Sequence, residues 1–352
     1  MKTTLTILSL SLIAAVAQSA FLFVNLDGGT PYTQVQPAVN AASAGDTIVV
    51  AANLAGYQGF NVDRRLVIIG AGYGTGTGQS TQIAGVVTLL STADSTELWS
   101  LWIRHTISSG VDSLGSVLVI RSGTTGIFIS RCLLENYSGS SPGSAYLGYG
   151  STADFLQTIF WHSFGSYVGL ATRSASSANV VNCEFSNLSY CINQTGGGTG
   201  NLTVRQCVFA PSNIVIWTTV LGTIQNCAFM GTSTSFTCPN MTFSYCGFQT
   251  NLQSGTGNLL CTSAAFVNLN LTSPRTSDYH LAASSVLRDA GNPTLFDVDS
   301  TRSDIGIYGG LNPMVDNGVP AFPFVSELDV PMVVPQSGAV RFYVRGVIGS
   351  AE

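Results

Sequence analysis

A short pattern of apolar and polar positions recurs along this chain, with the form apolar-x-x-Cys-x-Phe. Its clearest copies are 180–185, 204–209, 224–229 and 243–248. Weaker copies lie upstream, and a last copy is read at 261–266. With the Cys position as the anchor, the repeat predicts anchors at 101, 132, 158, 183, 207, 227, 246 and 264. The anchors are roughly 20–30 residues apart, and repeats of this length are typical of solenoids. In a solenoid, stacked copies bury apolar faces that no single copy buries alone.

The residues between the anchors favour short strands and turns, because Gly, Ser, Thr and Asn are mixed with Val, Ile and Phe. We therefore predict an all-β fold, a parallel solenoid with coils about 4.8 Å apart. Alternation places the anchor and the residue two positions later inside, so that Cys and Phe form inward ladders. The residue after the anchor points outward, and on four coils it is apolar, which is typical of a partner surface: Leu133, Ile159, Val208 and Ala228.

The two ends of the chain depart from the repeat. Apolar residues with helical spacing at 35–42, followed by Gly45, predict a short helix that covers the open end of the first coil. Beyond residue 310, two alternating segments at 327–334 and 339–347 flank a Pro-Gln-Ser-Gly turn and predict a hairpin. The hairpin either packs on the last coil or belongs to a sorting or anchoring module. The predicted organisation is a signal peptide at 1–20, a solenoid domain at 21–310 and a linker with hairpin at 311–352.

Composition and the first residues indicate export. Of 352 residues, 9% are charged, and the net charge of −5 argues against nucleic acid as a partner. Residues 1–20 combine Lys2, an apolar run too short to span a bilayer comfortably, and an Ala-x-Ala site at 15–17. We expect a secreted, extracellular or cell-surface protein with no transmembrane segment after cleavage. Five of eight cysteines hold anchors and are expected to be buried thiols, whereas Cys191, Cys238 and Cys261 are left open to pairing.

The opening and closing segments resemble a known superfamily. Gln36, Gly45-Asp46-Thr47-Ile48 and Ile69-Gly70-Ala71-Gly72 are similar to the start of secreted parallel β-helix proteins of the pectate-lyase-like superfamily. Residues 289–293 and 297–310 resemble the closing segment of exported bacterial members. The resemblance covers roughly 30–310 and implies a right-handed helix, an extracellular setting and often a carbohydrate ligand or substrate. Because the superfamily also holds proteins without known activity, it does not fix the function.

Aligning the coils at the anchor predicts one cluster of functional side chains. Three residues after the anchor lie Arg104, Glu135 and Trp161, and four residues after it lie His105 and His162, separated by an Asn. We call these five residues the ledge. Aromatic faces stack on sugars and Arg binds carboxylates bidentately, so the ledge is a candidate ligand site. The alternative is a solvated turn in which His and Asn bond to the backbone.

The acids give little support for catalysis. Between residues 114 and 277 the only acids are Glu135, Asp154 and Glu184, at different positions of the repeat. Glycosidases need paired carboxylates. Because these three acids lie at different positions of the repeat, the alignment predicts no such pair. Arg104, Glu135 and His162 remain the candidates for a catalytic role.

Three aspartates near the C-terminal end offer the only candidate metal site. Asp297, Asp299 and Asp304 could gather around calcium, although their spacing departs from an EF-hand loop. No other cofactor is predicted. The competing interpretation is structural, with Asp289 and Arg302 forming a buried ion pair that closes the last coil.

Three functional hypotheses follow. The first is an exported, non-catalytic protein that binds polysaccharide or cell-surface glycan or has a structural role. The second is a polysaccharide lyase or glycoside hydrolase that acts on an acidic polysaccharide at the ledge. The third is a subunit that stacks end to end, against which the predicted capping helix argues. The sequence does not give the oligomeric state.

Overall fold

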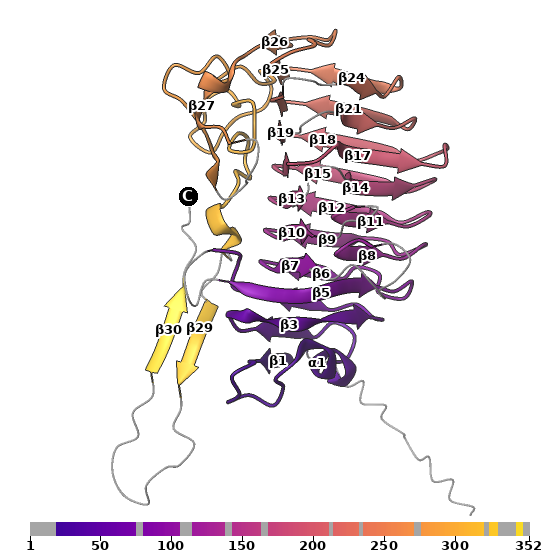
Figure 1. Ribbon diagram of the computed structural model, residues 1–352, viewed down its shortest axis with the longest axis vertical. Coiled ribbons are helices and arrows are strands. Elements are labelled where there is room, and N and C mark those ends of the chain that lie inside the picture. The colour runs from indigo at the N-terminus through magenta and orange to yellow at the C-terminus, as the bar shows by residue number, and fades with distance from the viewer. Residues whose placement is uncertain are drawn as a thin grey trace, which may run out of the picture.

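The computed structural model describes residues 19–74, 80–105, 115–137, 143–162, 168–210, 214–231, 235–270, 276–319, 324–329 and 343–347. The predicted parallel β-helix is confirmed, because its strands stack coil upon coil along one long axis (Figure 1). Of the leader predicted at 1–20, only Ser19 and Ala20 belong to the described residues. No helix in the described ranges is long and apolar enough to cross a membrane.

The first sheet takes one strand from each coil, all in parallel. Its strands are, in spatial order, β1 (Phe21–Val24), β2 (Thr47–Val50), β4 (Val67–Ile69), β6 (Glu97–Trp99), β9 (Ile127–Ser130), β12 (Thr152–Leu156), β15 (Ser177–Val181), β18 (Asn201–Arg205), β21 (Leu221–Gln225) and β24 (Met241–Ser244).

The second sheet has two halves joined by the long strand β5 (Thr81–Leu89), which also pairs with β3 (Asn53–Val62). One half, called the β7–β26 half, contains β7 (Trp102–His105), β10 (Leu133–Asn136), β13 (Ile159–His162), β16 (Glu184–Ser186), β19 (Val208–Ala210), β22 (Ala228–Phe229), β25 (Gly247–Phe248) and β26 (Leu259–Leu260). The other, called the β8–β23 half, contains β8 (Leu118–Ile120), β11 (Ala145–Leu147), β14 (Val168–Arg173), β17 (Tyr190–Thr195), β20 (Ile214–Trp217) and β23 (Phe236–Thr237).

The interior of the helix holds the two predicted ladders. Successive phenylalanine rings stack almost parallel along the axis, with centroid separations of 4.5, 4.9, 4.7 and 5.0 Å between Phe160, Phe185, Phe209, Phe229 and Phe248. All eight cysteines are free and buried, including the three whose pairing the sequence left open. Burial raises the pKa of the Cys132 thiol to about 12, so the anchor cysteines act as neutral, apolar side chains.

The residue before each anchor makes a bend that the sequence pattern did not predict. It adopts the left-handed conformation on successive coils, with φ of 54° at Arg131, 50° at Gln157, 49° at Asn182, 53° at Gln206 and 54° at Asn226. The following anchor side chain donates a hydrogen bond to the carbonyl before the bend, as in Cys183 Sγ to Val181 O (3.2 Å). Thr158 Oγ1 makes the equivalent bond at 3.0 Å, which explains why Thr replaces Cys there.

The two ends of the helix are built differently. The predicted N-terminal helix is confirmed as α1 (Val35–Ala41), which buries Val35, Ala38 and Val39 against the first coil. The predicted anchor at 264 is wrong. The last coil continues through β26, whose pairing with β25 aligns Asn258 with Cys246, whereas 263–265 form a short 3-10 helix, η1 (Ser263–Ala265). A hydrogen bond from the Cys246 amide to the Asn258 side chain replaces the expected Cys anchor.

The chain then turns back along the β7–β26 half (Figure 1). This return contains the antiparallel strands β27 (Phe266–Asn268) and β28 (Asp278–Leu281), followed by the short helix η3 (Asp316–Gly318). It covers the apolar stripe, since Leu133, Ile159, Val208 and Ala228 are buried in one cluster with residues of the return such as Ile305 and Ile307. The sequence pattern predicted that the stripe binds another molecule. This prediction is wrong, because the C-terminal return of the same chain covers the stripe.

The side chains of the bend residues hold the last part of this return, residues 303–319, which we call the strap. Asn182 Nδ2 donates to the carbonyls of Ile307 and Gly309 (both 2.8 Å), Gln206 Nε2 to that of Asp304 (2.9 Å) and Arg131 to that of Val319 (2.8 Å). Gln157 Nε2 donates likewise to the Pro313 carbonyl, whereas Asn226 Nδ2 donates to the Ser303 hydroxyl at 3.2 Å. Beyond the strap, β29 (Phe324–Asp329) and β30 (Tyr343–Val347) pair antiparallel, as the predicted hairpin requires. The first strand begins at 324 rather than at 327, and the predicted Pro-Gln-Ser-Gly turn lies outside the described residues. The division into domains at 20 and 310 stays a prediction.

Candidate functional site

The ledge forms with the predicted register. Strands β7, β10 and β13 pair so that Glu135 lies between Arg104 and Trp161, and Asn136 lies between His105 and His162. This agreement follows from the anchor alignment, because every residue after a fixed bend keeps its position from coil to coil.

Within the ledge, Glu135 is buried and held by two hydrogen-bond donors and one ion pair. Trp102 Nε1 donates to its Oε2 at 2.7 Å, the Tyr137 hydroxyl donates to its Oε1 at 2.8 Å, and Arg104 Nε lies 3.5 Å from Oε2. The Arg104 guanidinium also lies 4.6 Å from the Tyr137 ring centroid and retains 27% of its side-chain exposure. A carboxylate with this many partners is poorly suited to act as a free base. The sequence pattern missed Trp102 and Tyr137, which lie on the same outward face.

The two ledge histidines are not displayed at the surface. His105 is 6% exposed and His162 is fully buried, whereas Trp161 is half-buried with its ring 5.6 Å from that of Tyr137. Burial lowers the pKa of His105, which favours its neutral form. The structure therefore brings Arg104, Glu135 and Trp161 together on the outward face and places the histidines beneath the surface. A binding or catalytic role for the five stays a prediction.

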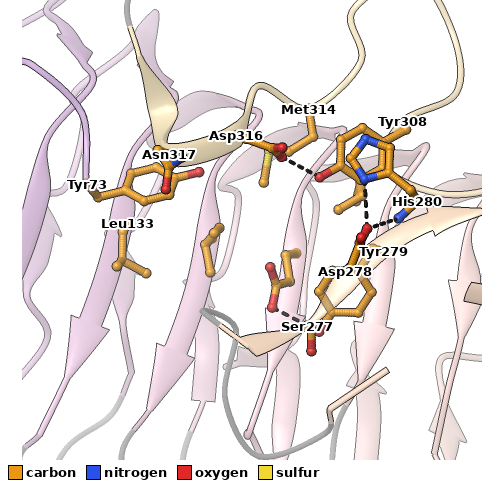
Figure 2. Close-up of a pocket in the computed structure, with 13 residues that line it drawn as sticks. Tyr73, Leu133, Ser277, Asp278, Tyr279, His280, Tyr308, Met314, Asp316 and Asn317 are labelled. Carbon is orange, nitrogen blue, oxygen red and sulfur yellow. Dashed lines mark hydrogen bonds and ion pairs between the residues drawn. The ribbon is translucent and has the colours of Figure 1, made fainter. Parts of the chain in front are cut away.

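A pocket of about 350 Å³ lies on the same sheet half, between the coils and the C-terminal return (Figure 2). Leu133 and Ile159 of the former apolar stripe form part of its wall, and Tyr73 closes one side. The return contributes the stacked rings of His280 and Tyr308, whose centroids lie 3.8 Å apart. The pocket thus combines an apolar floor with aromatic and polar walls, which is the usual composition of a ligand site.

Glu184 on β16 is the buried acid of this pocket. It is 2% exposed, and its Oε1 accepts a hydrogen bond from the Tyr279 hydroxyl at 3.0 Å. Burial raises the pKa of Glu184 to about 7, although hydrogen bonds from the side chains of Ser186 and Tyr279 act in the opposite direction. Its shifted pKa and its place in a pocket make Glu184 a candidate functional residue.

The other acids of the pocket come from the return. Asp278 Oδ1 lies 2.7 Å from His280 Nδ1, and Asp316 Oδ1 accepts the Tyr308 hydroxyl at 2.6 Å. Repeat alignment missed these residues because they lie outside the coils. The signal available in the sequence was local: acids and aromatic residues concentrate again in the segments around 278–280 and 308–316.

The raised pKa of Glu184 predicts that the free energy of unfolding depends on pH. Because folding raises the pKa of Glu184 to about 7, the folded protein keeps this proton between about pH 4.5 and pH 7 while the unfolded chain releases it. Stability from this group is therefore greatest below pH 4.5 and falls as pH rises to 7, by about 3 kcal/mol. We expect the difference in unfolding free energy between wild type and Glu184→Gln to follow this decline in urea titrations. A difference independent of pH would contradict it.

A calcium site at Asp297, Asp299 and Asp304 stays a prediction, and their carboxylates make local hydrogen bonds in the structure. Asp297 accepts the amides of Asp304 and Gly310, and Asp299 accepts the amide and hydroxyl of Thr301. Among the described residues, no group of three His, Cys, Asp or Glu side chains is arranged to hold a metal ion. Asp297 and Asp299 instead order the turn from 297 to 310, whereas Asp304 Oδ1 accepts the amide of Asp289 at 2.6 Å.

The alternative ion pair does not form either. Arg302 Nε donates to the Gly291 carbonyl at 2.7 Å, and Arg302 does not pair with Asp289 in the described part of the chain. The turn is therefore held by side-chain to backbone hydrogen bonds rather than by an ion pair.

The β8–β23 half displays a second set of aromatic side chains. Register places Tyr146, Ala171, Asn193 and Trp217 in one outward column across four strands. Trp217 is 47% exposed and its ring lies 5.8 Å from that of Tyr190. Arg173 Nε donates to the Tyr146 hydroxyl at 3.1 Å, with the guanidinium 5.7 Å from the ring. This column, the open column, spans three strand spacings, about 14 Å.

Comparison with known proteins adds a likeness in structure. No family model matches the chain, and no curated protein matches it. Among solved structures it is similar to one described as the crystal structure of pectate lyase Pel9A, with 12% sequence identity and a TM-score of 0.45. The alignment covers 84% of this chain and 97% of that chain. The assignment to the parallel β-helix architecture rests on the strand pairing described above.

Proposed function

We propose that this protein is an exported, non-catalytic parallel β-helix protein that binds polysaccharide or cell-surface glycan. The observation that carries the proposal is the open column, in which Trp217 exposes nearly half of its surface at 47%. Exposed aromatic faces on a rigid sheet offer stacking surface for the apolar faces of sugar rings at little entropic cost. Tyr146 and Arg173 add hydrogen-bonding and cationic groups farther along the same face.

Export is the second part of the proposal. It rests on the leader pattern at 1–20, and the low content of charged residues, 9%, is compatible with a neutral glycan as ligand. The ledge is a weaker candidate contact, because Glu135 is fully occupied by Trp102, Tyr137 and Arg104.

The test is binding to a panel of labelled neutral and acidic polysaccharides, with polymer length followed in the same samples. We expect one class to be retained without shortening, and Trp217→Ala to weaken its binding about five-fold or more, since truncating an anchoring tryptophan at an interface costs roughly 1 kcal/mol or more. Trp99→Ala, a half-buried tryptophan on the first sheet, is the matched control and should bind normally. Equal binding by wild type and Trp217→Ala would refute the site.

A catalytic alternative has one observation in its favour, the raised pKa of Glu184 in the pocket. A polysaccharide lyase or glycoside hydrolase would shorten one polymer of the panel. That shortening would disappear in Glu184→Gln and persist in Trp217→Ala at saturating polymer, which separates the two functions.

A further inference from the structure

The charged groups that line the pocket beneath the C-terminal return are mainly acidic. Three carboxyl groups line it, from Glu184, Asp278 and Asp316, and no Lys or Arg is among its lining residues. Its one basic lining residue is His280, which is bound to Asp278. The guanidinium of Arg131, near Tyr73, is bound to Gln157 Oε1 and to the Val319 carbonyl rather than directed into the cavity. An anionic ligand would therefore meet repulsion here, whereas a cation would be attracted.

A buried carboxyl group lies in this pocket with only hydroxyl donors beside it. Glu184 is 2% exposed, its Oε1 accepts a hydrogen bond from the Tyr279 hydroxyl at 3.0 Å, and the Ser186 side chain is its other hydrogen-bonding neighbour. Neither hydroxyl carries a positive charge. Burying an ionised carboxylate is costly without a positive partner, and a ligand that supplies positive charge would reduce that cost.

Aromatic rings surround the same space. Figure 2 shows Tyr73 on one side of the pocket and the stacked rings of Tyr308 and His280 on the other. The pKa values of Tyr73 and Tyr308 are both raised, chiefly by burial and then by the negative charges of Asp316 and Glu184. Aromatic faces in a negative field are the arrangement that binds organic cations through cation–π attraction.

We propose that this pocket binds an organic ammonium group, with the Glu184 carboxylate as its counter-ion and Tyr73 and Tyr308 as its aromatic walls. The cavity of about 350 Å³ has room for a quaternary ammonium or for one amino sugar residue. Asp316 lies at the exposed rim, where its charge attracts the cation toward the entrance. The proposal does not depend on glycan binding at the open column, which lies on the other half of the sheet.

Ionisation of Glu184 couples this binding to pH. The titratable groups around it are Tyr73, Tyr279 and Tyr308 together with Asp278, Asp316 and His280. Because the pKa of the free Glu184 is about 7, a bound cation favours its ionised form and releases a proton. Affinity for a cation whose own charge is constant should therefore increase between pH 6 and pH 8, by up to about ten-fold.

The experiment is calorimetric titration of the full chain with choline and with its uncharged isostere 3,3-dimethyl-1-butanol. Glucosamine and N-acetylglucosamine form a second pair, which distinguishes an amino sugar from a methylated ammonium. We expect at least one cation to bind ten-fold or more tightly than its neutral counterpart. For choline we also expect the increase between pH 6 and pH 8.

Variants separate the proposed contacts from general effects. Glu184→Gln should weaken cation binding at least ten-fold and abolish its pH dependence, and Asp316→Asn should weaken it less while leaving the core untouched. Asp154→Asn, an exposed acid on the first sheet, should bind as wild type. Equal affinity for a cation and its neutral isostere, absence of binding by both cations, or unchanged binding in both Glu184→Gln and Asp316→Asn would overturn the proposal, whatever the outcome at Trp217.

Discussion

Replacing Phe209 with alanine is expected to lower the free energy of unfolding by about 3–5 kcal/mol. Phe209 is fully buried in the middle of the phenylalanine ladder, with ring centroids 4.9 Å from Phe185 and 4.7 Å from Phe229. Truncation leaves a cavity that two rigid neighbouring coils cannot close, and it also removes two stacking contacts worth about 0.5–1.5 kcal/mol each. Because each coil is stabilised through its neighbours, the loss should weaken coils on both sides.

The measurement is denaturant unfolding followed by far-UV circular dichroism. Phe296→Ala is the matched control, since Phe296 is 53% exposed and should contribute within about 0.5 kcal/mol of zero. A loss below about 1 kcal/mol in Phe209→Ala would mean that the ladder does not carry the stability of the coils.

The second large effect is expected at Asn182, where alanine should release the strap. Its side-chain amide supplies hydrogen bonds to the Ile307 and Gly309 carbonyls. The Ile307 carbonyl would still accept the Met314 amide, so the main loss is at the Gly309 carbonyl, where a missing donor should cost about 1–3 kcal/mol. The left-handed φ of 49° adds about 1–2 kcal/mol of strain for alanine, which tolerates this conformation less well than asparagine. Limited trypsin digestion at Arg288 and Arg302 should become roughly a hundred-fold faster, since 1.4 kcal/mol corresponds to a factor of ten.

Asn182→Gly separates the two causes, because glycine removes the hydrogen bonds without the backbone strain. Tryptic cleavage should be faster in Asn182→Gly than in the wild type, but slower than in Asn182→Ala. Cleavage as slow in Asn182→Ala as in wild type would show that the apolar contacts alone hold the strap in place.

The internal structure of the coils could be predicted from the sequence. The repeat predicted the inward ladders and the register that places Glu135 between Arg104 and Trp161, since both depend on spacing within or between neighbouring copies. The capping helix was predicted from a different signal, the helical spacing of apolar residues at 35–42. The last anchor failed because Asn258 replaces Cys through a side-chain hydrogen bond to a backbone amide, which no hydrophobic pattern records.

The pocket and the strap could not be predicted in the same way. Asn182 contacts the carbonyls of residues 125 and 127 positions later, and Glu184 meets Tyr279, which is 95 positions away. Such contacts depend on where the chain runs after it leaves the repeat. The outward apolar stripe was found correctly but assigned to a partner molecule, because its pattern does not distinguish a foreign surface from a distant part of the same chain.

The strap also sets a limit on the length of this helix. Each bend residue from Arg131 to Asn226 is hydrogen-bonded to its own strap residue, from Val319 for Arg131 to Ser303 for Asn226. Successive coils therefore bind successively earlier residues of the strap. An extra coil inserted between these bends would fit the stacking of the core, yet it would shift every later bend out of line with its strap carbonyl. Coils can therefore be added or removed in this region only together with a matching length of strap, whereas a coil added beyond Asn226 escapes that constraint.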